Sequence, residues 1–145
     1  MKHKEEAVAK VYNLFISHSW SYPKAYDGLV GLLNKRPYFF YNNFSVPKDD
    51  PIHITGTDTR LYNAIKNKMT TCHVVIIMAG VYATYSKWIS KEIDIAKSGF
   101  LYPKPILAVR PWAQTKVSTL VSQNADDFAN WNTESIIGKI RALTP

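Results

Sequence analysis

The stretch "HVVIIMAG", residues 73 to 80, decides the fold of this chain. It is a nearly continuous apolar run in which β-branched side chains dominate. Runs of this kind form the central strands of parallel sheets, where helices cover both faces of the strand. We therefore predict a buried strand here, with the rest of the chain arranged around it.

On both sides of this run, apolar segments of strand length alternate with longer segments of helical period. Further strands are predicted in "YNLFISHS" (12–19), "YFFYNNFSV" (38–46), "KPILAVRPW" (104–112) and "ADDFANWN" (125–132). Helices are expected after Pro23, after a cap at Thr57 or Asp58, from Trp88 to a closing Gly99, and over 133–143 with Thr133 as its cap. This order predicts an α/β fold: a flavodoxin-like three-layer sandwich with a central parallel sheet of about five strands, and ligands at the carboxyl ends of those strands.

Length and composition suit a single domain over residues 1–145, since 46% of the 145 residues are hydrophobic and 20% are charged. No apolar run of about 18 residues is present, so we expect no membrane span. The first residues, "MKHKEEAVAK", lack the apolar stretch of a secretory signal. The one cysteine, Cys72, cannot form an internal disulfide, so we expect a cytoplasmic protein and a buried structural thiol.

The charge balance is basic, with 18 Lys and Arg against 11 Asp and Glu and a formal net charge of +7. This favours anionic partners in general. The positive residues are scattered singly, however, and neither a zinc-knuckle spacing nor a recognition-helix signature occurs, so nucleic acid is not an expected partner.

Glu92, in the stretch "WISKE", differs from the other acid of its predicted helix. Asp94 has Lys91 and Lys97 at three-residue spacing, which is typical of a solvated, paired surface acid. Glu92 has no cation at such positions. Two interpretations follow: a functional carboxylate with a raised pKa, or a carboxylate that points to water at the edge of the apolar stripe. The residues three and four positions from Glu92 are all apolar: Trp88, Ile89, Ile95 and Ala96.

Two further stretches are candidates for a pocket. "ISHSW" (16–20) ends the first strand, where its polar and aromatic side chains either line a pocket or form a capped turn over the core. Neighbouring strand residues face opposite sides, which argues against a Ser–His nucleophilic pair. In "SVPKDDPIH" (45–53), Asp49 and Asp50 either hold a metal or are solvated turn residues. No ligand spacing among the histidines predicts a metal site, and no glycine-rich phosphate loop is present.

Together these stretches resemble the signature of TIR domains. "LFISHS" (14–19) is similar to the family's first strand, "SVPKDDPI" (45–52) to its BB loop, and "ADDFANWN" loosely to its last region. The segment 74–96 is similar to the pattern Y-x-x-S-x-W-x-x-x-E: Ser86, Trp88 and Glu92 fall on it, and Tyr82 lies one position before the place of its tyrosine. The chain most resembles the prokaryotic TIR-like proteins of the Thoeris anti-phage system.

The resemblance implies an NAD+-cleaving enzyme, with NAD+ as substrate and no further cofactor or metal. Glu92 would be catalytic, and its product would be a cyclic ADP-ribose-type signal, or ADP-ribose and nicotinamide. After the first-strand serine, many family members carry Tyr or an Arg-bearing segment in place of this chain's residues 18–20. The substrate-binding residues implied by the resemblance are Trp88, Ser17, His18, Ser19, Trp20, Tyr85, Pro47 and Asp49.

The resemblance also implies partners. The chain would associate with further copies of itself through TIR surfaces. It would also act on a separate effector through a nucleotide messenger. The alternative within the family is a non-catalytic signalling scaffold that acts by self-association or by binding a partner through the BB loop.

Overall fold

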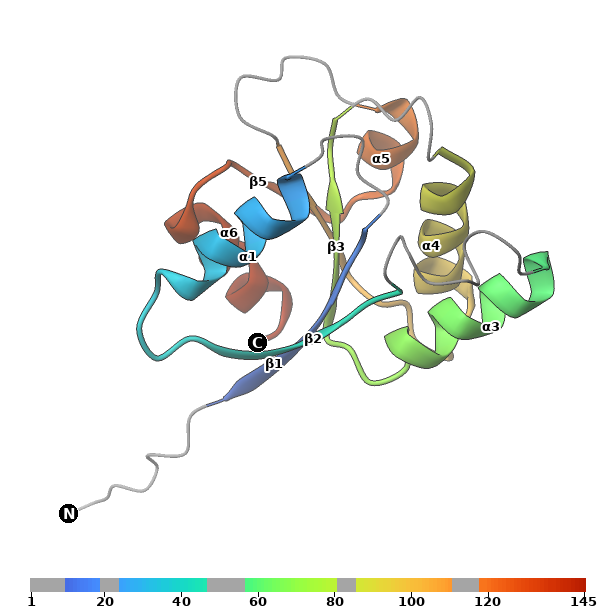
Figure 1. The fold of residues 1–145 in the computed structure, drawn as a ribbon, viewed down its shortest axis with the longest axis horizontal. Coiled ribbons are helices and arrows are strands. Elements are labelled where there is room, and N and C mark those ends of the chain that lie inside the picture. The colour runs from blue at the N-terminus through green and yellow to red at the C-terminus, as the bar shows by residue number, and fades with distance from the viewer. Residues whose placement is uncertain (1–9, 19–23, 47–56, 81–85, 111–117) are drawn as a thin grey trace.

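A parallel sheet forms the centre of the computed structural model, which describes residues 10–18, 24–46, 57–80, 86–110 and 118–145. Its strand order is β2-β1-β3-β4-β5, the flavodoxin-like order, and this confirms the predicted α/β fold (Figure 1). The strands are β1 (Val11–Ile16), β2 (Phe40–Phe44), β3 (Val74–Met78), β4 (Ile106–Val109) and β5 (Asp127–Ala129).

Helices cover both faces of this sheet. Figure 1 shows α1 and α6 on one face and α3 and α4 on the other. Every residue of β3 and β4 has no exposed surface, as expected for strands covered on both sides. The helices are α1 (Ala25–Asn34), α3 (Asp58–Met69), α4 (Ser86–Ser98), α5 (Thr119–Asn124) and α6 (Thr133–Leu143).

The strand order reverses between β1 and β3. β1 pairs with β2 on one side and with β3 on the other, with Leu14 opposite Val74. The Ser17 N–H donates to the Ile76 carbonyl at 3.0 Å, so the contact with β3 continues one residue beyond β1. Ser17 therefore stands at the carboxyl end of the sheet, at the point where doubly wound folds bind their ligands.

Some predicted boundaries were wrong. The chain between β4 and β5 contains α5, which the sequence pattern did not predict because a helix of six residues shows too little periodicity. β2 begins two residues later than predicted, since Tyr38 has a left-handed backbone (φ 61°) that a strand does not accommodate. β5 has only the three residues Asp127–Ala129.

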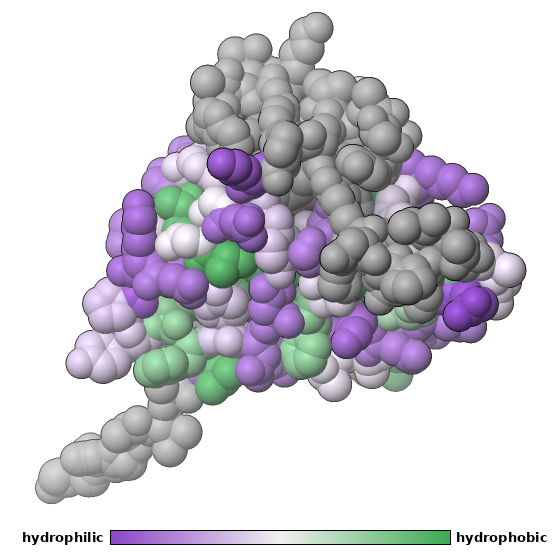
Figure 2. Space-filling view, in the orientation of Figure 1, coloured by the Kyte–Doolittle hydropathy of each residue, from purple (hydrophilic) through white to green (hydrophobic). Residues whose placement is uncertain are grey.

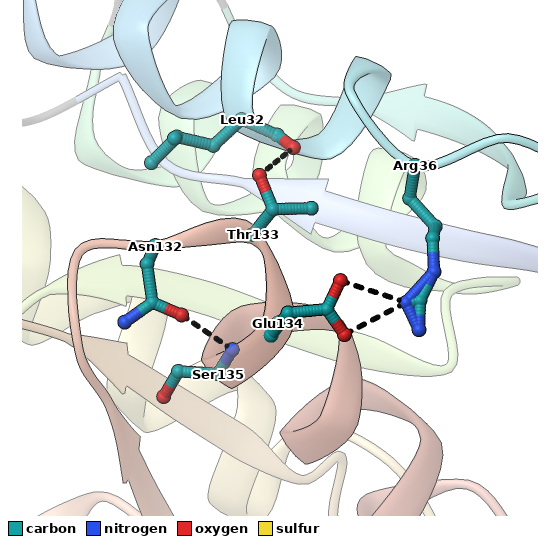
Figure 3. Close-up of polar contacts among 6 residues, drawn as sticks. All are labelled: Leu32, Arg36, Asn132, Thr133, Glu134 and Ser135. Atoms are coloured by element: carbon teal, nitrogen blue, oxygen red, sulfur yellow. Dashed lines mark hydrogen bonds and ion pairs between the residues drawn. The ribbon is translucent and has the colours of Figure 1, made fainter.

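The N-terminal cap of α6 is Asn132 and not the predicted Thr133. The Asn132 side-chain oxygen accepts from the Ser135 N–H at 2.8 Å (Figure 3). The Thr133 hydroxyl instead donates to the Leu32 carbonyl on α1 at 2.6 Å. Arg36, just beyond α1, pairs with Glu134 at 2.8 Å, so the start of α6 is fastened to the end of α1.

Two other predictions about single residues are confirmed. Cys72 is buried, and burial raises the pKa of its thiol to about 12. Gly99 follows the last residue of α4, and its N–H donates to the Ile95 carbonyl at 2.8 Å. A Cβ atom at position 99 would lie 2.7 Å from that carbonyl oxygen, so the close approach requires glycine.

The described surface mixes polar and apolar residues, as the hydropathy colouring of Figure 2 shows. Val11 and Phe40, which are partners across β1 and β2, are both nearly half exposed. Within the described ranges, none of the helices is long and apolar enough to cross a membrane.

Candidate functional site

Glu92 is the centre of the candidate site. It lies in α4, and none of its surface is exposed, so the interpretation in which it points to water is wrong. Asp94, two residues along the same helix, is exposed as predicted. The helical period places these two acids on different sides of α4, and only Glu92 faces the sheet.

Each carboxyl oxygen of Glu92 accepts a hydrogen bond. The Ser17 hydroxyl donates to Oε1 at 2.6 Å, and the Trp88 indole N–H donates to Oε2 at 3.1 Å. Ser17 comes from the end of β1 and has no exposed surface, whereas Trp88 lies one turn before Glu92 on α4. The site thus joins the helix after β3 to the carboxyl end of β1.

Burial raises the pKa of Glu92 from the ordinary value of 4.5 to about 8. The hydrogen bonds from Ser17 and Trp88 act in the opposite direction, because they stabilise the charged form, but burial outweighs them. The raised pKa expected from the apolar neighbours of Glu92 is confirmed. A carboxyl group in this state can exchange a proton near neutral pH, which is a property of functional sites.

His18 points away from Glu92. Its ring stacks on the Tyr26 ring of α1, with centroids 3.8 Å apart and planes 18° apart, and its Nε2 lies 3.0 Å from the Ser45 hydroxyl. Ser17 and His18 therefore contact elements on opposite faces of the sheet, as the strand alternation predicts. Both residues stand at the same end of β1, but His18 belongs to the face covered by α1.

Sequence reasoning did not identify Tyr26 and Ser45 as neighbours of His18. Tyr26 lies in the helix that was expected after Pro23. The signal that could have found it is the same alternation, which turns His18 toward the face that the next helix covers.

The expected pairing of Asp94 is wrong. Lys91 lies 3.9 Å from Asp58 of α3, and Lys97 lies 3.4 Å from Asp126. Across the described ranges, neither lysine forms an ion pair with Asp94. Tertiary packing offers both lysines acids on neighbouring elements, and a pattern within one helix cannot reveal these partners.

Several predicted site residues lie outside the described residues: Ser19, Trp20, Pro47, Asp49 and Tyr85. The structure brings together Ser17, Trp88 and Glu92 and places His18 on the other side of the sheet. Among the side chains that the structure does describe, no group of three or more His, Cys, Asp or Glu is placed to hold a metal ion.

Comparison with known families gives a match over most of this chain. The family model described as "Thoeris protein ThsB, TIR-like domain" matches residues 15–116. The matched range begins in β1, ends after β4 and contains Ser17, Trp88 and Glu92. The search of the curated proteins finds no match.

Proposed function

Because the chain belongs to the family of TIR-like domains of the Thoeris protein ThsB, we propose that it is an NAD+-cleaving enzyme of anti-phage defence, with Glu92 as its catalytic residue. One observation carries the proposal. Glu92 is a fully buried carboxyl group with a hydrogen-bond donor on each oxygen, at the carboxyl end of a doubly wound sheet. A buried ionisable group costs stability, so its presence at a ligand-binding position supports a role in chemistry.

The proposed reaction breaks the bond between the ribose C1′ and the nicotinamide nitrogen. The bonding electrons leave with nicotinamide, which departs as a neutral molecule, and positive charge develops on the ribosyl group as in glycoside cleavage. An ionised Glu92 next to this centre would stabilise that charge. Such stabilisation is strongest where water is excluded, and the burial of Glu92 provides this condition.

The hydrogen-bonding capacity of Glu92 leaves room for the substrate. An ionised carboxylate has about four acceptor positions, and Ser17 and Trp88 occupy one on each oxygen. The remaining positions can accept from ribose hydroxyls. Because Glu92 has no exposed surface, binding of NAD+ requires that a group now covering the carboxyl moves aside.

The product follows from the nucleophile that reaches the ribosyl centre. Addition of water, with loss of its proton, yields ADP-ribose, whereas attack by a group of the same nucleotide yields a cyclic ADP-ribose isomer. We propose the cyclic product as a signal to a separate effector, and we propose self-association through surfaces of the domain as a means of assembling the site.

The test is nucleotide chromatography of NAD+ incubated with the purified protein over a range of protein concentrations. We expect consumption of NAD+ and release of nicotinamide. Glu92→Gln should lower the rate at least about a hundredfold, because a neutral amide cannot stabilise the developing charge. The matched control is Asp94→Asn, which makes the same change of charge at the exposed acid of α4 and should retain activity.

The glutamine variant is suited to this test because the site can accept it. The indole can donate to the amide oxygen, and the Ser17 hydroxyl can accept from the amide N–H₂. Equal rates for the wild type and Glu92→Gln would remove Glu92 from the catalytic role. A wild type that leaves NAD+ intact at every concentration would favour the signalling scaffold instead.

A further inference from the structure

The two donors that hold Glu92 differ in their chemistry. An indole N–H can only donate, so the Trp88 contact requires Oε2 to be an acceptor at all times. A serine hydroxyl can donate or accept. The Ser17 contact at Oε1 is therefore compatible with both the charged and the protonated form of Glu92.

This asymmetry assigns separate roles to the two oxygens. When Glu92 is ionised, the Ser17 hydroxyl donates to Oε1. When Glu92 binds a proton, that proton belongs on Oε1, because the new O–H can then donate to the Ser17 oxygen while Oε2 keeps its bond from Trp88. A proton on Oε2 would instead place an O–H donor beside the indole N–H donor, which weakens the hydrogen bond from Trp88.

From this geometry we propose that Ser17 is a positioning residue of the site, which orients Glu92 and stabilises its charged form through the bond to Oε1. The sequence interpretation placed Ser17 in the wall that contacts NAD+. The structure directs its hydroxyl at Glu92, 75 positions away in the chain, and both residues are fully buried. In this role Ser17 acts on the reaction through Glu92.

The charged form of Glu92 depends on such donors because, among the residues that the structure describes, no cation offsets its burial. Among the described residues, the polar groups that affect the pKa of Glu92 are Ser17 from β1 and Trp88 from α4 itself. The neighbouring Lys91 is directed to Asp58 on α3. Of the two neutral donors, Ser17 makes the shorter bond, at 2.6 Å against 3.1 Å, so its removal should have the larger effect.

The experiment follows the ionisation of Glu92 directly, by NMR titration of the whole protein labelled with ¹³C at glutamate carboxyl carbons. The remaining glutamates are Glu5, Glu6 and Glu134, so the Glu92 signal is identified by its absence from Glu92→Gln. Ser17→Ala should raise the pKa of Glu92 by about one unit or more, because a donor to the charged form is lost. Ser17→Thr keeps the hydroxyl and should restore most of the wild-type value.

The link to turnover rests on the proposed function and is measured separately. In the pH profile of kcat/KM for NAD+, the acid limb of Ser17→Ala should move to higher pH by the same amount as the Glu92 titration, with rates that approach wild type at high pH. The matched control is Ser98→Ala, the same substitution at an exposed position near the end of α4, which should leave both curves unchanged.

Each outcome bears on one claim. An unchanged Glu92 titration in folded Ser17→Ala overturns the proposal, and so does a shifted titration with an unshifted acid limb. A shifted titration in a protein that never cleaves NAD+ supports the Ser17–Glu92 coupling and rejects the proposed function. If Ser17→Ala does not fold, Ser17→Cys, which has a similar size and a weaker donor, takes its place with a smaller shift expected in the same direction.

Discussion

Two carboxylates of this protein accept hydrogen bonds from two groups each, yet their pKa values move in opposite directions. Asp127, at the start of β5, accepts from the Phe128 N–H at 2.8 Å and lies 3.2 Å from the Lys139 ammonium of α6, and these contacts lower its pKa. Glu92 accepts from Ser17 and Trp88, and its pKa is raised to about 8.

Access to water and to a cation accounts for this difference. The Asp127 side chain keeps 35% of its surface exposed, so its charge remains hydrated and also gains a cation. Glu92 has no exposed surface, and within the described residues its donors are the neutral groups of Ser17 and Trp88. Two good hydrogen bonds therefore do not offset the desolvation of a carboxylate. Asp127 belongs to an ordinary surface contact, whereas Glu92 occupies an unfavourable position that a stability argument alone does not explain.

The largest expected effect concerns the pH dependence of stability in Glu92→Gln. The folded-state pKa of Glu92 lies above its ordinary value of 4.5, so the folded protein binds more protons than the unfolded chain between about pH 4.5 and 8. The wild type should lose stability as the pH rises through this window, and the glutamine variant should not. We expect the free energies of unfolding of the two proteins to diverge by about 3 to 5 kcal/mol over the window.

Denaturant unfolding at a series of pH values measures this divergence. Other titrating groups are common to both proteins and cancel in the difference between the curves. Parallel curves from pH 4 to pH 9 would show that Glu92 is hydrated like Asp127, and the contrast between the two carboxylates would disappear.

A smaller effect is expected for Trp88→Phe, which removes the indole N–H from Oε2 and retains an aromatic ring. The pKa of Glu92 should rise further, by about half a unit to one unit, because the lost bond is longer than the one from Ser17. The carboxyl titration by NMR measures this change. Trp131→Phe, at a tryptophan that packs partly buried against the core, serves as control and should leave the Glu92 titration in place.

The smallest effect is expected for Asp127→Asn. Because the pKa of Asp127 is lowered on folding, its contribution to stability is present above its ordinary pKa and is lost as the pH falls through the folded value. Water screens this exposed pair, so the variant should lose less than about 1 kcal/mol at neutral pH and nothing in strong acid. The control is Asp94→Asn, at an acid without an ion pair in the described part of the chain. This variant should change stability neither at neutral nor at acid pH.

If Asp127→Asn lost as much stability at neutral pH as the removal of a buried ion pair costs, Asp127 would not belong to the hydrated surface. Thermal unfolding of both asparagine variants at neutral and at acid pH makes the comparison.

Most of the fold could be predicted because the signals are local. The run over 73–80 contains β3, and the strands and helices around it follow from periods of two and of about four residues. The errors also have local causes. α5 is too short to show a period. The cap of α6 is Asn132 and not Thr133, because the Thr133 hydroxyl bonds to the Leu32 carbonyl of α1, a helix that is distant in the chain.

The sequence by itself determined that Trp88 and Glu92 share one side of a helix, that the flanking residues of Glu92 are apolar, and that Ser17 and His18 face opposite sides of the sheet. These relations depend only on the geometry of one helix or one strand. The tertiary structure decided that Ser17 meets Glu92, that His18 meets Tyr26, and that Lys91 turns to Asp58. Residues so far apart in the chain become neighbours only when α4 packs against the sheet, and the same packing removes the water that would otherwise keep Glu92 an ordinary acid.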